Sequence, residues 1–114
     1  MNWEDMRKKY PECRDEMPEE REKAFVGDCY RLYEKEGFNK KFWSNGGDFK
    51  QYHGKAFSVI GRTPIYDGNN RGADLECLPM WQIRFEDGTE ISAYPDEVIP
   101  SEMKDAGCPT KYFA

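Results

Sequence analysis

The sequence predicts an α+β fold: a small antiparallel barrel or curved sheet with an N-terminal amphipathic helix packed on it. Residues 81–100 (WQIRFEDGTEISAYPDEVIP) alternate apolar and polar side chains, as strands with one buried face do. Residues 25–33 repeat apolar side chains at steps of three and four, the spacing of one helix face. We expect a single domain over the 114 residues, with a helical part (1–53), a β part (54–100) and an irregular tail (101–114).

Two helices are predicted in the N-terminal part. Asn2 is a suitable N-cap for a short helix with Trp3 and Met6 on one side, and Pro11 ends it. The longer helix, residues 18–36, begins at a proline followed by glutamates, which complement the helix dipole. We expect its apolar stripe to pack on the β part. That stripe consists of Phe25, Val26, Cys29, Leu32 and Tyr33.

The middle of the chain has weaker signals. Residues 38–54 predict a short aromatic segment, a glycine-rich loop and a helical turn around Phe49. Residues 55–62 (KAFSVIGR) predict a strand, and residues 66–73 (YDGNNRGA) predict a loop.

The register of the last hairpin can also be predicted. A two-residue turn at Asp87-Gly88 would place Ile91 opposite Arg84 and mix apolar with polar side chains on each face. A three-residue loop, residues 86–88 with Gly88 left-handed in a bulge, keeps the faces separate. We therefore expect the three-residue loop. Its pairs are Trp81 with Ala93, Ile83 with Ile91, and Arg84 with Glu90.

A glycine-led strand (residues 54–57), a long polar loop, a strand–Asp-Gly–strand hairpin and a closing DEVI turn follow one another in residues 54–100. This order resembles small SH3-like and Tudor-like barrels. Tudor-like members that bind ligands use an aromatic cage, and a full cage does not align with this chain. The segment LPMWQIRFEDGTEISAYPDEVI also looks like small uncharacterised proteins of bacterial phages and mobile elements.

No catalytic or metal signature is present, so we expect a protein that is not an enzyme and has no cofactor. His53 is the only histidine, and no serine or cysteine motif points to it. The four cysteines have no CxxC spacing, and we expect reduced thiols with Cys29 and Cys77 buried. The chain has neither an apolar run long enough for a bilayer nor a signal-like start, which predicts a cytoplasmic protein without membrane contact.

Residues 72–114 carry a net charge of −6 within a chain of net charge −5. The leading prediction is a non-enzymatic interaction protein of the phage or mobile-element type that binds a basic partner protein. It could act as an inhibitor of a host nucleic-acid enzyme, as anti-CRISPR proteins do. The competing interpretation is that these carboxylates only keep a small domain soluble. The predicted acidic surface comprises Asp74, Glu76, Glu86, Asp87, Glu90, Asp96, Glu97 and Glu102.

Residues 38–71 instead carry a net charge of +4 and several aromatic rings. The alternative prediction is an SH3- or Tudor-like module that binds nucleic acid through cations and stacked rings. A structural interpretation competes with it, in which Phe42, Trp43 and Phe49 pack into the core and the lysines form its rim. The sequence leaves open whether the cations share a face, and it also leaves the oligomeric state open. The predicted basic set comprises Lys40, Lys41, Trp43, Lys50, Tyr52, Lys55, Arg62 and Arg71.

Overall fold

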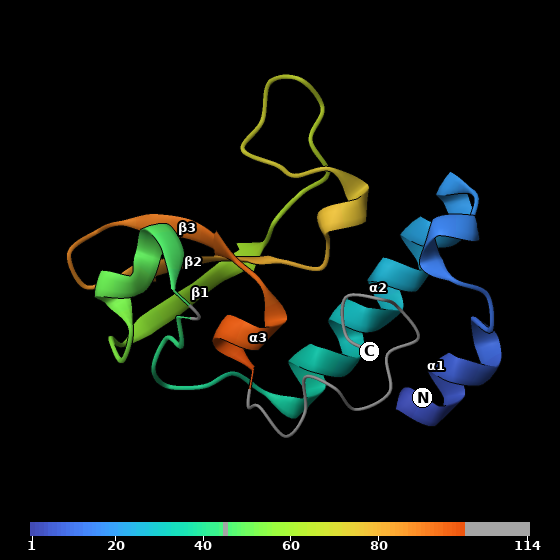
Figure 1. Cartoon of the computed structure of the whole chain (residues 1–114), viewed down its shortest axis with the longest axis horizontal. Helices are drawn as coiled ribbons and strands as arrows, with labels where there is room; N and C mark the ends of the chain where they lie inside the picture. The colour runs from blue at the N-terminus through green and yellow to red at the C-terminus, as the bar shows by residue number, and fades with distance from the viewer. Residues whose placement is uncertain (45, 100–114) are drawn as a thin grey trace.

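The computed structural model describes residues 1–44 and 46–99 and has the predicted α+β class (Figure 1). One antiparallel sheet, in the order β1-β2-β3, is combined with helices that precede and follow it. The strands are β1 (Phe57–Arg62), β2 (Trp81–Phe85) and β3 (Glu90–Ala93), and the α-helices are α1 (Trp3–Lys9), α2 (Glu19–Glu36) and α3 (Pro95–Val98). Three short 3-10 helices are η1 (Arg14–Glu16), η2 (Gly47–Tyr52) and η3 (Leu75–Cys77).

The sheet is open over the described residues, with β1 at one edge and β3 at the other. The register between β1 and β2 shifts between Val59 and Gly61, and a single bridge joins Lys41 to Ala56 just before β1. Strand β1 begins at Phe57, two residues later than predicted. Nothing in this arrangement identifies an SH3-like barrel, so that resemblance stays a prediction. The predicted irregular tail, residues 101–114, lies outside the described residues.

The predicted hairpin register is confirmed. Strands β2 and β3 pair Trp81 with Ala93, Ile83 with Ile91 and Arg84 with Glu90. The Phe85 amide donates to the Thr89 carbonyl at 2.9 Å, and the Gly88 amide donates to the Phe85 carbonyl at 3.0 Å. Gly88 has a φ of +88°, a left-handed conformation that a residue without Cβ adopts at little cost. Three residues therefore form the loop, and the apolar face of the hairpin stays together.

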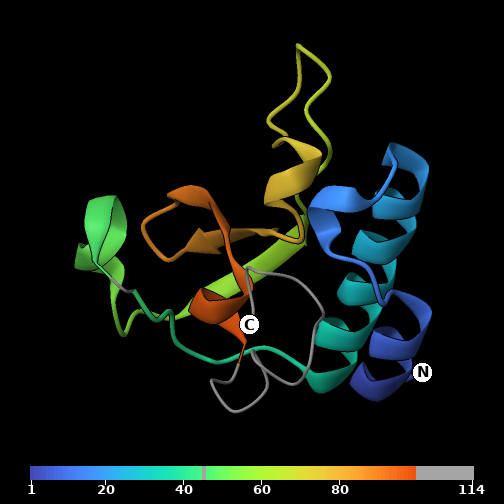
Figure 2. The same ribbon diagram turned by 45° about the vertical axis from the view of Figure 1, so that its right-hand side comes forward.

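The N-terminal helices also follow the sequence signals. Asn2 and Asp5 form a capping box at the start of α1, with reciprocal bonds of 2.8 and 2.9 Å between side chains and amides. Helix α2 begins at Glu19, with Pro18 as its N-cap, one residue later than predicted. Figure 2 shows α1 lying alongside α2. The Trp3 ring lies 4.7 Å from the Tyr33 ring, which places the apolar side of α1 against α2.

The core lies between α2 and the inner face of the sheet. Trp81 of β2 is 1% exposed, and its ring meets those of Tyr30, Tyr33 and Phe38 at centroid distances of 5.4, 5.9 and 5.3 Å. The α2 side chains predicted to face the β part, including Phe25, are buried. Burial of each large apolar side chain contributes about 1.5–3 kcal/mol, so this interface supplies much of the folding free energy.

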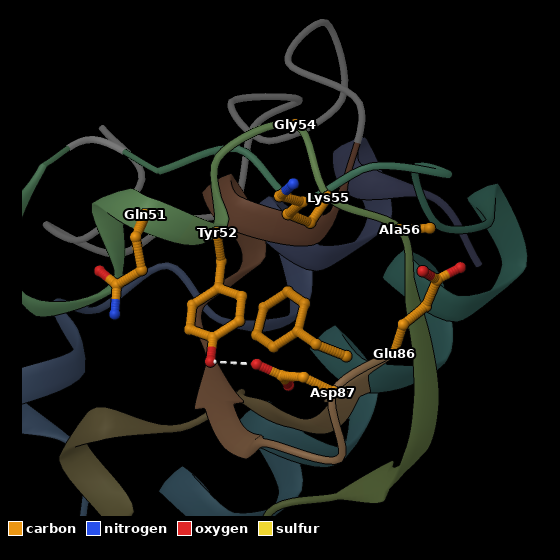
Figure 3. Close-up of a pocket in the computed structure, with 8 residues that line it drawn as sticks. Gln51, Tyr52, Gly54, Lys55, Ala56, Glu86 and Asp87 are labelled. Carbon is orange, nitrogen blue, oxygen red and sulfur yellow. Dashed lines mark hydrogen bonds between the residues drawn. The ribbon is translucent and has the colours of Figure 1, made fainter.

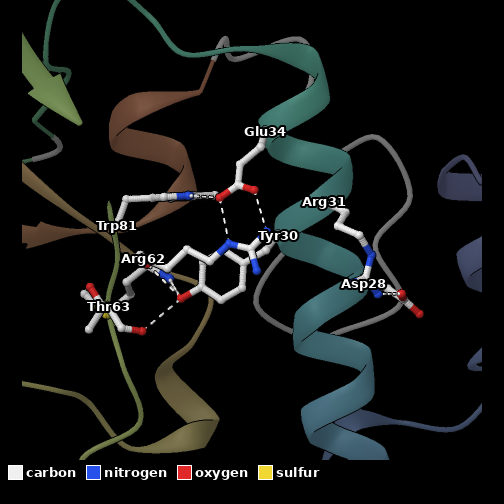
Figure 4. Close-up of polar contacts among 8 residues, drawn as sticks. Asp28, Tyr30, Arg31, Glu34, Arg62, Thr63 and Trp81 are labelled. Carbon is white, nitrogen blue, oxygen red and sulfur yellow. Dashed lines mark hydrogen bonds and ion pairs between the residues drawn. The ribbon is translucent and has the colours of Figure 1, made fainter. Parts of the chain in front are cut away.

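Polar contacts also join α2 to the sheet (Figure 4). The Glu34 carboxylate accepts from Trp81 Nε1 at 3.0 Å and from two Arg62 nitrogens at 2.6 and 2.9 Å. The Arg62 guanidinium holds the pKa of Glu34 below its usual value. The Tyr30 hydroxyl accepts from the Met80 amide at 3.1 Å and donates to the Met80 carbonyl at 2.8 Å. Arg62, one of the predicted nucleic-acid contacts, therefore contributes to the contact between α2 and the sheet.

Candidate functional site

The predicted acidic surface is not one surface. Asp74 and Glu76 lie at η3, and Glu86 and Asp87 lie in the hairpin loop. Asp96 and Glu97 lie in α3. Figure 1 shows the hairpin loop, η3 and α3 at separate places on the molecule. Glu102 lies outside the described residues. The sequence placed these carboxylates close together along the chain, and the fold separates them.

Several of these carboxylates have partners within the chain. Glu90 forms ion pairs with Arg84 at 2.9 Å and Arg71 at 3.4 Å, and the bond from Arg84 lowers the pKa of Glu90. Glu97 is half-buried and accepts from the Tyr94 amide at 2.8 Å, and burial raises its pKa. These two carboxylates serve the fold. Asp87 and Glu97 form hydrogen bonds but no ion pair with a described residue. Four members of the predicted set form neither an ion pair nor a side-chain hydrogen bond with any residue that the structure describes: Asp74, Glu76, Glu86 and Asp96.

A pocket of about 500 Å³ opens between the hairpin loop and the segment that leads from η2 into β1 (Figure 3). We call it the hairpin pocket. It brings together residues from both predicted sets, since two members of the acidic set and two of the basic set line it. The lining residues are Gln51, Tyr52, Gly54, Lys55, Ala56, Phe85, Glu86 and Asp87.

The aromatic wall of the hairpin pocket is fixed by stacking and hydrogen bonds. The Tyr52 and Phe85 rings stack at a centroid distance of 4.2 Å with an interplanar angle of 16°. The Tyr52 hydroxyl donates to Asp87 Oδ2 at 2.7 Å, and the Thr89 amide donates to Asp87 Oδ1 at 2.9 Å. The Thr89 amide and the Tyr52 hydroxyl lower the pKa of Asp87, because both hydrogen bonds favour its charged form.

The pocket presents two carboxylates, those of Glu86 and Asp87, against the single ammonium of Lys55. In Figure 3 Lys55 lies near the top of the pocket, Asp87 lies at the bottom beside Tyr52, and Glu86 lies on the right. Because Tyr52 and Phe85 stack on each other, they do not enclose a space between them. The pocket is therefore not an aromatic cage of the Tudor kind. It is an open recess with excess negative charge and a flat aromatic wall.

The basic set also divides into two groups. Arg62 and Arg71 form ion pairs with Glu34 and Glu90, so these two arginines are occupied. The four lysines of the set are exposed and form no ion pair with a described residue. Phe42 is buried at 1% exposure, as the core-packing interpretation predicted. The same interpretation is wrong for Trp43 and Phe49, which are 43% and 38% exposed. We call Lys40, Lys41, Lys50, Lys55, Trp43, Phe49 and His53 together the lysine surface.

Backbone contacts fold the lysine surface back on itself. The Phe42 amide donates to the Lys55 carbonyl, and the Gly54 amide donates to the Phe42 carbonyl, both at 2.8 Å. The Ser44 amide donates to His53 Nδ1 at 3.0 Å, and the Trp43 and His53 rings lie 6.4 Å apart. His53 and Phe49 are not members of the predicted basic set. No sequence signal identified His53, because its partners come from a segment nine residues away.

The described residues contain no group of three or more His, Cys, Asp or Glu side chains that could hold a metal ion. None of the described helices is both long and apolar enough to cross a bilayer. Cys29 is buried as predicted, whereas Cys77 is only half-buried because it lies in the short η3 turn. Cys13 is exposed, and the three described cysteines form no disulfide with one another.

Comparisons with protein-family models, with curated proteins and with solved structures found no match for this chain.

Proposed function

We propose that the protein is a non-enzymatic binding protein that holds a basic side chain of a partner protein in the hairpin pocket. The observation that carries this proposal is that Glu86 and Asp87 both line a recess with an aromatic wall. Asp87 is held by the Tyr52 hydroxyl and by the Thr89 amide, whereas exposed Glu86 has no cation partner among the described residues.

An arginine side chain fits this recess better than a lysine side chain. A guanidinium is planar, donates in a fixed fork that matches a carboxylate, and stacks on an aromatic face. Glu86 supplies the free carboxylate, and Tyr52 supplies the aromatic face. Lys55 on another side of the pocket disfavours a second cation, which limits the site to one basic group.

The partner class that matches this chemistry is a protein with a strongly basic surface. The remaining carboxylates without ion pairs, Asp74, Glu76 and Asp96, add to the negative field that would steer such a partner toward the protein. A nucleic-acid channel of another protein has such a surface. An inhibitor of the anti-CRISPR kind would act by occupying such a channel. We propose this activity for the present protein, as a protein of phage or mobile-element type.

The proposal is tested with an arginine-rich peptide and a matched peptide in which citrulline replaces arginine. Citrulline keeps the shape but has no charge. In a ¹H–¹⁵N titration, the arginine peptide is expected to shift the amide signals of Gly54, Glu86 and Asp87, while the citrulline peptide leaves them unchanged. Glu86→Gln should weaken binding by roughly three- to fivefold, the size of one exposed charge pair.

Glu76→Gln is the matched control, because Glu76 is an exposed carboxylate without an ion pair on another part of the described fold. It should change the affinity by less than Glu86→Gln does. Equal effects of the two substitutions, or equal binding of both peptides, would reject the hairpin pocket as the site. The charge reversal Glu86→Lys then serves to identify the native partner, which should be captured by the unmodified protein and lost by this variant.

A further inference from the structure

We propose that the lysine surface is a second binding site, independent of the hairpin pocket, and that it takes single-stranded nucleic acid. Two kinds of side chain belong to this surface: exposed lysines that form no ion pair with a described residue, and the exposed rings of Trp43 and Phe49. Of these residues, Lys55 also lines the hairpin pocket and so borders both sites.

The charge of this surface points to a polyanion. Residues 38–56 contain four lysines and a single carboxylate, Asp48, although the whole chain has a net charge of −5. Each lysine is exposed and lacks an ion pair with any residue of the described ranges. By contrast, three of the four lysines on α1 and α2 form ion pairs: Lys8 with Glu4, Lys9 with Asp28, and Lys23 with Glu19 and Glu20. Unpaired ammonium groups grouped in this way are suited to contact successive phosphates.

The aromatic rings decide between a single strand and a duplex. Trp43 and Phe49 expose 43% and 38% of their surface, far more than Trp3 at 7% and Trp81 at 1%. Bases of a single strand can stack on such rings, whereas the base faces inside a duplex are covered. The His53 ring lies beside Trp43 at an interplanar angle of 68°, so it adds a second ring at a different inclination. Residues 38–56 thus carry both exposed rings, on which bases can stack, and lysines, which can contact phosphates. Proteins that bind single-stranded nucleic acid combine these two features.

The segment is also held in place before any ligand binds. Two backbone bonds of 2.8 Å join Phe42 to residues 54 and 55, and buried Phe42 packs on Phe85 at a centroid distance of 5.3 Å. Trp43 is further placed by its amide, which donates to the Glu97 carbonyl at 3.0 Å. These contacts hold the backbone at residues 42, 43, 54 and 55, which lowers the entropy cost of binding at these positions.

The test is fluorescence anisotropy with a labelled 15-nucleotide poly-dT strand and a labelled duplex of the same length, at several salt concentrations. The single strand should bind more tightly. If four lysines contact phosphates, the logarithm of the association constant should fall with the logarithm of salt concentration at a slope of about −2 to −3. Tryptophan fluorescence should be quenched on binding, and Trp43→Phe should remove most of that quenching because Trp3 and Trp81 are buried.

Charge-matched variants make the test specific. The triple variant Lys40→Gln, Lys41→Gln and Lys50→Gln should lose about tenfold or more in affinity and reduce the salt slope to about −1. The control triple variant Lys8→Gln, Lys23→Gln and Lys35→Gln removes the same charge from α1 and α2 and should bind nearly as well as the unmodified chain. Circular dichroism establishes that both variants are folded.

Absence of binding, equal loss in both triple variants, or tighter binding of the duplex would each overturn the inference. Glu86→Gln keeps this test separate from the proposed function, since it should weaken the arginine peptide and leave the poly-dT affinity unchanged or slightly higher.

Discussion

At the residue scale, Glu34 is the carboxylate that links α2 to the central strand β2 through the Trp81 indole and to the edge strand β1 through the Arg62 guanidinium. Glu34→Ala would leave the buried Trp81 N–H without an acceptor, which costs about 1–3 kcal/mol of the free energy of unfolding. Glu34→Gln keeps an acceptor oxygen and should cost less. Urea denaturation of the two variants measures the difference.

The same carboxylate gives a pH dependence with a defined sign. Arg62 lowers the pKa of Glu34 in the folded state, so its stabilisation is fully present above the unfolded pKa and is lost as pH falls through the folded pKa. Glu34→Gln should therefore flatten the loss of stability in acid. Glu4→Gln is the control, because the Glu4–Lys8 pair is highly exposed and should contribute little at any pH. An unchanged acid profile in Glu34→Gln would contradict the role of this contact.

Residues also show where the sequence was insufficient. Phe42 and Trp43 are neighbours in an aromatic segment, yet one is buried and the other is 43% exposed. The segment is too short for a periodic pattern, so nothing in the sequence separates the two rings. Their fates depend on the contact of residue 42 with residues 54 and 55, which is a tertiary contact. The structural interpretation of this segment was therefore right for Phe42 and wrong for Trp43.

At the element scale, the hairpin loop depends on Gly88, whose φ is +88°. A Cβ at this position makes the left-handed conformation sterically unfavourable, so Gly88→Ala should destabilise the protein by about 1–2 kcal/mol. Gly61→Ala is a matched control in β1, since it does not have a positive φ and a Cβ there meets open space. The control should be within about 0.5 kcal/mol of the unmodified protein. Thermal denaturation measures both, and equal losses would contradict the bulged loop.

The hairpin and the helices could be predicted because their signals are local. Alternation from Trp81 to Phe85 and the apolar residues of β3 specify the register, since a slip of one residue would expose the core. The Asn2 cap and the proline before α2 mark helix starts in the same local way. No local signal in the sequence indicates that the edges of the sheet are open. The prediction of a barrel came instead from the resemblance to SH3-like and Tudor-like proteins.

At the scale of the whole molecule, counting charges along the chain was a poor guide to its surfaces. Arg62 pairs with Glu34, 28 residues earlier, and Arg71 pairs with Glu90, 19 residues later. These pairs remove both arginines from the basic set and one carboxylate from the acidic set. The hairpin pocket and the lysine surface remain, and Lys55 belongs to both. Counting charges along the sequence cannot distinguish these two sites, because long-range contacts decide which charged residues remain unpaired.

The last prediction concerns cooperativity. Helix α2 contacts α1 through the Trp3–Tyr33 rings and the sheet through the Trp81 cluster, so Tyr33 belongs to both interfaces. A chain joined in this way should unfold in one transition. In the Trp43→Phe variant, fluorescence reports only Trp3 and Trp81, both buried, while far-ultraviolet circular dichroism reports the helices. The two urea transitions should coincide at the same midpoint. Separate midpoints would mean that the helical part and the sheet fold independently, and the shared Tyr33 contacts would then contribute too little free energy to couple them.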